Sequence, residues 1–261
     1  MEQRVFAPIH NCDGEMITWE GSEYRYSGVA WCIRAPGSRI QTITDWPGLR
    51  PHGVSNKVPT TVIYSTGGSR VVSWGFEVTQ GTAELDRRRG SRLNETEPFS
   101  WFKLLLQPQT LPSEDGEAEG SPELNTIRGL LEKYHKSAYE VSTDYLRKLW
   151  GHTKQHLGRR LGGNFLDLYE VLVVLTTPAV WTPGSTKTAE RLARDAGFPG
   201  TIHLLQEPEA AAIEVLEEPA SESLLKLNDI ITVCDAGGGT CVSGLPISDK
   251  QQLLTYILPR I

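Results

Sequence analysis

Short apolar runs separated by turn residues predict that the first third of the chain is rich in β-strands. Residues 26–43 have the pattern of a strand, a turn and a second strand, and residues 58–64 form a further apolar run. Residues 71–76 follow Gly67-Gly68-Ser69, which is typical of a hairpin turn. Residues 1–24 show no clear period, so no element is predicted there.

After this β-rich part the pattern turns helical. Residues 97–106 carry several large apolar side chains and predict a short helix or strand. Residues 112–123 are acidic and poor in large apolar groups, which predicts a solvated, mobile loop. From residue 124 to about residue 161, apolar residues recur at spacings of three and four, as on the buried face of a helix.

Strands and helices then alternate. Residues 169–177 predict a buried strand that ends at Pro178, and Thr182-Pro183 is typical of a helix start. Residues 201–205 are a short apolar run, after which Glu207-Pro208 is predicted to open another helix. This alternation is typical of a parallel or mixed α/β sheet.

A glycine-rich segment follows the last apolar run of this series. Residues 230–234 predict a buried strand, and Asp235-Ala236-Gly237-Gly238-Gly239-Thr240 comes directly after it. Glycines lack a Cβ, so their backbone N–H groups can approach an anion closely, and the Thr240 hydroxyl adds a donor. Asp235 could orient a hydrated divalent cation beside bound phosphates. The same residues also fit a tight β-hairpin without a ligand, and the segment alone leaves both interpretations open.

Composition narrows the class of protein. The 261 residues carry a net charge of −6, which makes DNA or another polyanion a poor default partner. No apolar stretch approaches the roughly 20 residues that span a bilayer, and the N-terminus has no signal-peptide pattern. The four cysteines are scattered and form neither a metal-binding spacing nor a disulfide framework. We expect a cytoplasmic protein that binds neither nucleic acid nor membrane.

Two histidines raise the question of a metal site. His152 and His156 are four residues apart and would share one face of the predicted helix. No third ligand is evident in the sequence. Exposed, solvated histidines are therefore the simpler interpretation.

Three motifs stand in a fixed order that resembles the nucleotide-binding domain of the 70-kDa heat-shock chaperones, in the actin-like ATPase superfamily. They are Thr176-Thr177-Pro178-Ala179 at a strand end, Glu207-Pro208-Glu209-Ala210-Ala211-Ala212, and Asp235 to Thr240. Several pieces look closest to divergent fungal-type relatives: Trp46-Pro47-Gly48, Lys57-Val58-Pro59-Thr60, Trp74-Gly75-Phe76, Trp101-Phe102-Lys103 and Trp181-Thr182-Pro183.

The resemblance implies a fold and roles for particular residues. The expected fold is α/β, of the ribonuclease H-like or actin-like ATPase kind, with a first lobe and the start of an incomplete second lobe. ATP and Mg²⁺ would be the ligands. Asp235 would help to hold the water shell of the metal, Glu207 would lie near the metal and the attacking water, and both would be catalytic. The β- and γ-phosphates would be bound by Gly237, Gly238, Gly239 and Thr240. The alternative for Glu207 is a helix-start carboxylate favoured by the helix dipole.

The chain departs from the family pattern in its first half. Where the family has a strand followed by Asp-Phe-Gly-Thr-Thr, the sequence before residue 26 is Glu20-Gly21-Ser22-Glu23-Tyr24-Arg25. The lysine expected shortly after Trp74-Gly75-Phe76 is also missing, because Glu77-Val78-Thr79 stands there.

The chain departs again after Thr240. Gly244 and Pro246 argue against a continuing central strand. The sequence ends at Ile261, before the family's adenosine-binding segment. We therefore expect weak or no nucleotide binding and a poorly ordered C-terminal tail.

The expected organisation has four parts. Residues 1–24 are unassigned, residues 25–205 form the first lobe, residues 206–245 begin the second lobe, and residues 246–261 are a divergent tail. The leading functional hypothesis is a chaperone-type ATPase with impaired activity, with client proteins or co-chaperones as further partners. The alternative is a catalytically inactive remnant or a protein-interaction module. A sugar or acetate kinase is disfavoured by the Glu-Pro-x-Ala-Ala-Ala signature.

Overall fold

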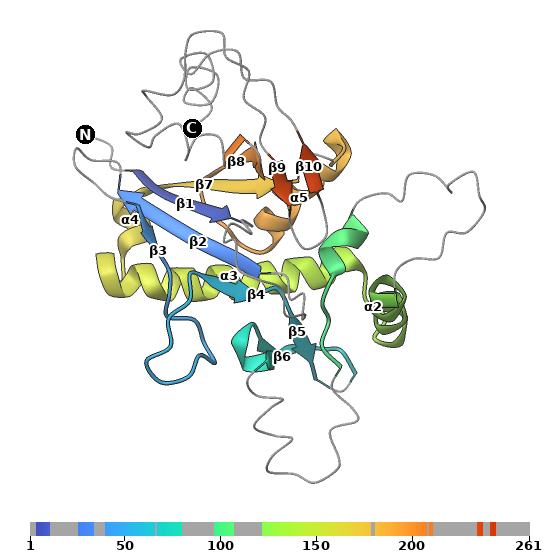
Figure 1. The fold of residues 1–261 in the computed structure, drawn as a ribbon. Helices are drawn as coiled ribbons and strands as arrows, with labels where there is room; N and C mark the ends of the chain where they lie inside the picture. Colours follow the sequence, from blue (N-terminus) through green and yellow to red (C-terminus); the bar gives the residue numbers. More distant parts are fainter. Residues whose placement is uncertain are drawn as a thin grey trace.

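A computed structural model of the protein describes ten segments of the chain. They are residues 4–10, 26–33, 40–65, 67–79, 97–106, 122–178, 181–207, 209–210, 234–236 and 241–243. The largest feature is a six-stranded sheet with the order β3-β2-β1-β7-β8, in which β4 also pairs with β2 (Figure 1).

The strands of this sheet run in both directions. β1 (Arg4–His10), β7 (Glu170–Thr177) and β8 (Thr201–Gln206) are parallel to one another, whereas β2 (Tyr26–Ile33) is antiparallel to β1. The short strands β3 (Gln41–Thr42) and β4 (Lys57–Pro59) both pair antiparallel with β2. The mixed α/β sheet predicted from the sequence is confirmed.

The central strand β1 is an element that the sequence pattern did not predict. It lies between β2 and β7, with Phe6 opposite both Cys32 and Leu172. Pro8 argues against a central strand because proline cannot donate a ladder hydrogen bond. Only pairing on both sides, with partners distant in sequence, identifies this segment as a strand.

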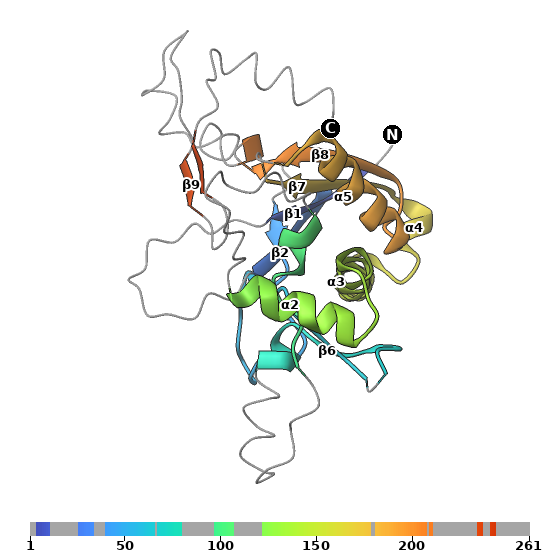
Figure 2. The ribbon, with the colours of Figure 1, turned by 90° about the vertical axis from the view of Figure 1, so that its right-hand side faces the viewer.

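One face of the sheet is covered by helices α3 (Ala138–Leu161) and α5 (Pro183–Asp195), which Figure 2 shows from the end of the sheet. The predicted helical region of residues 124–161 is in fact two helices, α2 (Pro122–Lys133) and α3. α3 begins with a capping box, in which Ser137 accepts from Glu140 N and the Glu140 carboxylate accepts from Ser137 N. The predicted Thr182 cap of α5 is confirmed, since its hydroxyl accepts from Ser185 N. A one-turn helix α4 (Phe165–Leu168) leads into β7.

Three other predicted boundaries changed. The run at residues 58–64 is divided between β4 and β5 (Val62–Tyr64), and β5 forms a separate antiparallel pair with β6 (Val71–Trp74). The segment at 97–106 contains a 3₁₀ helix, η1 (Phe102–Leu106). α2 begins at Pro122, within the predicted acidic loop, whose residues 112–121 lie outside the described segments.

A second small sheet holds the described part of the C-terminal region. β9 (Cys234–Ala236) pairs antiparallel with β10 (Cys241–Ser243). The predicted tail at 246–261 lies outside the described residues. Within the described segments, no helix combines the length and the apolar character needed to cross a membrane.

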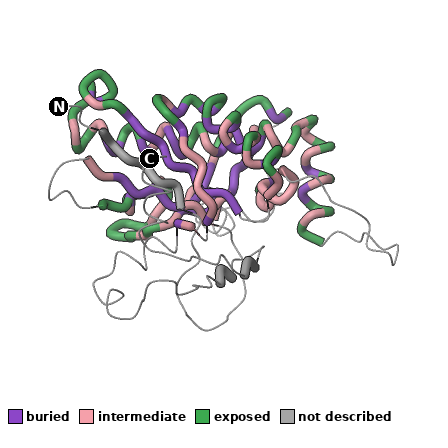
Figure 3. The backbone as a smooth tube through the Cα atoms, turned by 90° about the horizontal axis from the view of Figure 1, so that it is seen from above, coloured by how far each residue is buried: buried purple, intermediate pink, exposed green. Residues whose placement is uncertain are grey.

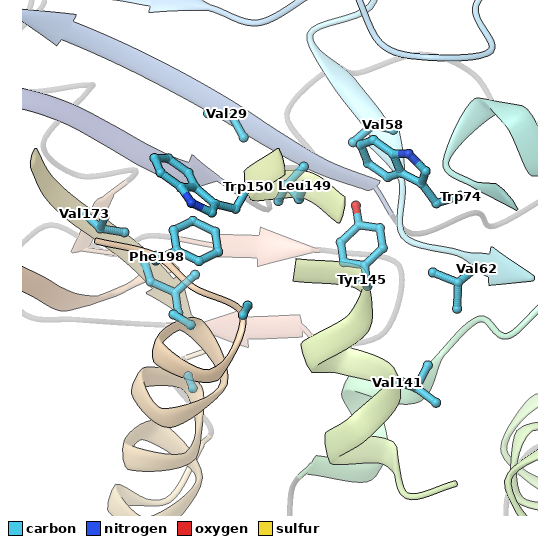
Figure 4. Close-up of a cluster of buried hydrophobic side chains, with 14 of the residues drawn as sticks. Val29, Val58, Val62, Trp74, Val141, Tyr145, Leu149, Trp150, Val173 and Phe198 are labelled. Atoms are coloured by element: carbon cyan, nitrogen blue, oxygen red, sulfur yellow. The ribbon is translucent and has the colours of Figure 1, made fainter. Parts of the chain in front are cut away.

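The core is concentrated between the sheet and α3 (Figure 3). Seven of the eight β7 residues are buried, as expected for a strand with neighbours on both sides. Figure 4 shows the α3 side chains Tyr145, Leu149 and Trp150 directed towards the sheet and the β4–β6 region, and the Trp150 ring lies 5.1 Å from Phe198. Because these side chains pack around α3, this helix connects the sheet to the smaller β5–β6 pair.

Candidate functional site

The parallel strands β1, β7 and β8 end at the same edge of the sheet. Their register places Ile9 opposite Leu175, and Thr177 opposite Gln206. The antiparallel strand β2 begins at this edge, with Gly28 opposite His10. Ligands of open α/β sheets bind outside the carboxyl ends of the strands, where the connections of neighbouring strands diverge. This edge, which we call the carboxyl edge, is therefore the first place to look for a site.

Glu207 lies at the carboxyl edge and is held by Lys103. Glu207 directly follows β8, its side chain is only 5% exposed, and its Oε1 accepts a hydrogen bond from Lys103 Nζ at 3.1 Å. Lys103 belongs to η1 and is also partly buried, with its ammonium 5.8 Å from the centre of the Trp181 ring. The structure thus brings a carboxylate, a cation and an indole together at the end of the sheet.

The role of Glu207 differs from that of its neighbour Glu209. The Glu209 carboxylate accepts from the backbone N–H of Gln206 at 2.9 Å, as a carboxylate at a helix start is expected to do. The Glu207 carboxylate instead contacts a side chain that is 104 residues away in sequence. Its ion pair with Lys103 goes beyond a simple interaction with the helix dipole.

Lys103 is the residue that sequence reasoning missed. The sequence has no lysine shortly after Trp74-Gly75-Phe76, and its motifs contain Lys103 only as part of Trp101-Phe102-Lys103. The structure nevertheless places a lysine against Glu207. A signal was available, because Lys103 is a lone cation in the apolar run 101–106, where a charge needs a partner.

The glycine-rich segment is described only at its two ends. Asp235 lies within β9, opposite Val242 of β10. Gly237, Gly238, Gly239 and Thr240 lie outside the described residues, as do residues 20–25. The antiparallel pairing gives the segment the flanks of a β-hairpin, and its Gly244 and Pro246 lie beyond the short strand β10. The roles of Asp235 and of the four loop residues remain predictions.

His152 and His156 are not exposed, so that interpretation was wrong. Both side chains are 9% exposed, and His156 Nδ1 lies 2.8 Å from Asp45 Oδ1, which the structure brings to α3 from the β3–β4 connection. Arg159 donates to Asp45 Oδ2 at 2.7 Å. Burial raises the pKa of Asp45, but the hydrogen bond and charge of His156 outweigh this and leave the pKa below its usual value. In the part of the chain that the structure describes, no group of His, Cys, Asp or Glu residues forms a metal site.

Several motifs that suggested the family have structural roles. The rings of Trp46 and Trp74 meet edge to face at 6.4 Å, and the Trp46 ring lies 5.2 Å from the His152 ring at a tilt of 37°. Gly48 has a φ of +82° and lies so close to the backbone of Phe76 and Glu77 that a Cβ would overlap it. Trp46-Pro47-Gly48 and Trp74-Gly75-Phe76 therefore fit against each other.

No protein-family model matches this chain. In sequence, it is 35% identical over 121 residues to a chaperone protein HscA homolog of Histophilus somni (strain 2336), which covers 46% of this chain and 16% of that protein. The HscA homolog of Methylobacillus flagellatus is 29% identical over 189 residues, covering 70% of this chain and 26% of that protein. The chain thus spans about a quarter or less of the length of these curated relatives. They are bacterial, and a fungal-type origin stays a prediction.

The structure was also compared with solved structures. MreB5 of Spiroplasma citri bound to ADP has a TM-score of 0.47 and 13% sequence identity, covering 95% of this chain and 50% of that one. The same protein bound to AMPPNP has a TM-score of 0.45. These scores are too low to assign a fold alone.

The similarity to these chaperones therefore rests on the aligned sequence. The motifs that carry the resemblance include the Thr177-Pro178 end of β7 and Glu207 after β8, which the structure places at one edge. Over the matched stretches the chain is similar in sequence to chaperone protein HscA homologs, which supports the resemblance to the 70-kDa heat-shock chaperones that its motifs indicate.

Proposed function

We propose that this chain is a chaperone-type protein that binds a nucleotide, and that the phosphates of the nucleotide bind at the carboxyl edge. The observation that carries the proposal is the buried Glu207 carboxylate and its 3.1 Å contact with Lys103 Nζ. Removing both charged groups from water costs desolvation free energy, which offsets much of their attraction. A buried ion pair is therefore weak evidence that the pair exists to stabilise the fold. Its position supports a function instead, because this pair stands where α/β sheets bind ligands.

The chemistry of the pair suits phosphoryl transfer. That reaction requires mainly positioning and neutralisation of phosphate charge. Glu207 would orient the attacking water, and Lys103 would contact phosphate oxygens. Asp235 and the glycine-rich segment would hold the β- and γ-phosphates and the water shell of Mg²⁺. When bound, Mg²⁺ would supply charge neutralisation between the phosphate oxygens.

We further propose that nucleotide binding is weak. To contact a phosphate, Lys103 would have to weaken or break its ion pair with Glu207. The free energy needed to break this pair would reduce the net free energy of nucleotide binding. The atypical sequence at residues 20–25 points the same way. Client proteins or co-chaperones are the partners that the relatives suggest, and a cytoplasmic location fits them. The competing proposal is an inactive remnant that keeps only protein contacts.

Isothermal titration calorimetry with magnesium-ATP is the direct test. We expect saturable binding with a Kd near the millimolar range. Thermal stabilisation would then be small, because ATP at five times its Kd adds only about 1 kcal/mol. Asp235→Asn should remove binding and any hydrolysis. The matched control is Glu190→Gln, which removes an exposed carboxylate paired with Arg194 on α5.

Two results would overturn parts of this proposal. A melting temperature that rises by several degrees at low ATP would refute weak binding. The absence of heat and of thermal stabilisation at ATP concentrations up to about 10 mM would refute nucleotide binding and favour the interaction module.

A further inference from the structure

Lys103 has another neighbour besides Glu207, the indole ring of Trp181. Its Nζ lies 3.1 Å from Glu207 Oε1 and 5.8 Å from the centre of the Trp181 ring. A cation within about 6 Å of an aromatic face is attracted by the ring, and tryptophan attracts cations more strongly than the other aromatic residues do. The ammonium is therefore attracted from two directions, by a carboxylate that follows β8 and by a ring that lies between β7 and α5.

The backbone around Trp181 holds this residue in place without help from Lys103. The Trp181 N–H donates to the carbonyl oxygen of Pro178, which directly follows β7, at 3.1 Å. The next residue, Thr182, caps α5 by accepting a hydrogen bond from Ser185 N. Trp181 is also partly buried against the hydrophobic core. Two elements and the core thus fix the position of Trp181, whichever group Lys103 contacts.

Lys103 differs because its charge stands at the end of a flexible side chain. The backbone of η1 is anchored by the buried Phe102, but four methylene groups separate the ammonium from that backbone. The hydrogen bond to one carboxylate oxygen restrains the distance to Glu207 and leaves the direction of approach variable. The ring of Trp181 restricts that direction, because the ammonium is attracted towards its face.

The attraction of the ring does not compete with a hydrogen bond of the ammonium. An ammonium has three N–H donors, and it donates to Glu207 Oε1 with one of them. The contact with Trp181 is therefore compatible with either partner of Lys103, the carboxylate in the free protein or a phosphate oxygen in the proposed complex.

We propose that Trp181 is a positioning residue, which holds the Lys103 ammonium at the carboxyl edge where the phosphates would bind. The role at the phosphates rests on the proposed function, whereas the positioning itself is a property of the protein without nucleotide. The side chain of Lys103 is 21% exposed, so the contact should lie between the exposed and desolvated limits for such pairs, about fivefold in an equilibrium constant. The competing explanation is packing alone, because Trp181 also lines a small, mainly apolar cavity with Phe102 and Leu192.

A double-mutant cycle in urea, without nucleotide, separates the two explanations. Trp181→Leu removes the ring, and Lys103→Met removes the charge. If the ring acts on the charge, Trp181→Leu should raise the unfolding equilibrium constant by a factor about five times larger in the unaltered protein than in Lys103→Met. A ring that only packs gives the same factor in both.

A second background and a control support this cycle. The cycle is repeated with Lys103→Met combined with Glu207→Gln, which leaves no buried carboxylate without its cation. Trp150→Phe is the control, because the Trp150 ring meets Phe198 rather than a cation, and its effect should be the same with and without Lys103.

The NMR signals of the Lys103 ε-methylene protons measure the position of the side chain directly. The ring current of an indole shifts protons above its face upfield. In Trp181→Leu these signals should move towards those of the exposed Lys154, whereas in Trp181→Phe they should lie between the two positions.

Calorimetry with magnesium-ATP then tests the role at the phosphates. Trp181→Leu should weaken ATP binding about fivefold, and Trp181→Phe should weaken it less. If the unaltered protein binds no ATP, the proposed function fails, and the cycle still decides whether Trp181 positions Lys103.

Three results would overturn the inference. Equal effects of Trp181→Leu with and without Lys103 would show that the ring only packs. Lys103 signals that do not move in Trp181→Leu would refute the positioning. Unchanged ATP affinity in a folded Trp181→Leu protein would refute its role at the phosphates.

Discussion

Burial and charge oppose each other at Glu207. Its carboxylate is 5% exposed and has the Lys103 ammonium 3.1 Å away, so removal of the cation would leave a buried charge without this partner. We expect Lys103→Met to destabilise the protein by about 3 kcal/mol, measured by urea denaturation. The double variant with Glu207→Gln removes both charges and should recover a large part of this loss. If the double variant were less stable than Lys103→Met, the unpaired charge would not be the cause.

His152 makes stability depend on pH. Burial lowers the pKa of His152 below its ordinary value of 6.5, although the nearby Asp45 carboxylate raises it in part. The unfolded chain therefore binds a proton at a higher pH than the folded protein does. The contribution of His152 is fully present above pH 6.5 and is lost as the pH falls from 6.5 towards the folded pKa.

Urea denaturation at pH 7.5 and at pH 5 measures this effect. His152→Phe keeps a ring against Trp46 and should reduce the loss of stability between the two pH values. His203, whose pKa is also lowered by burial, contributes in the same direction, so His203→Phe is the comparison that isolates His152. An unchanged pH dependence in His152→Phe would contradict the assignment.

Among the elements, β8 depends on the glycine that precedes it. Gly200 has a φ of +67°, and a Cβ there would lie only 1.9 Å from the carbonyl oxygen of Val171 in β7. We expect Gly200→Ala to destabilise the protein by about 2 kcal/mol, because backbone strain is added to a steric overlap. Gly163→Ala is the control, since nothing lies within 4 Å of a Cβ at that position. Equal stability of the two variants in urea would show that β8 can shift without cost.

Whether a segment forms a helix or a strand could be predicted from the sequence where its apolar or capping pattern is strong. Residues 169–177 and the cap at Thr182 predicted β7 and α5 because apolar runs and caps act over a few residues. The pattern did not show that Thr60 and Thr61 separate β4 from β5, since that division depends on which strand each half pairs with. It also did not show β1, whose Pro8 contradicts the usual composition of a central strand.

In the whole molecule, β7 is the strand around which the described core is built. It pairs with β1 and β8, and seven of its eight residues are buried. We expect its amides to exchange with solvent only through global unfolding, whereas those of α4, with the exposed Leu166 and Leu168, exchange through local opening. Native-state hydrogen exchange in low urea measures both. Exchange of β7 at the rate of α4 would contradict this assignment of the core.

The sequence by itself determined the α/β class, most helices and strands and the family resemblance, and it named Glu207 as a candidate site residue. These features depend on short-range periodicity, caps and ordered motifs, which remain legible without the fold. Only the tertiary structure decided that Lys103 pairs with Glu207 and that His156 meets Asp45, because these partners are 104 and 111 residues apart in sequence. Parallel pairing and the packing of the β3–β4 connection on α3 bring them together, and no local pattern encodes such distances.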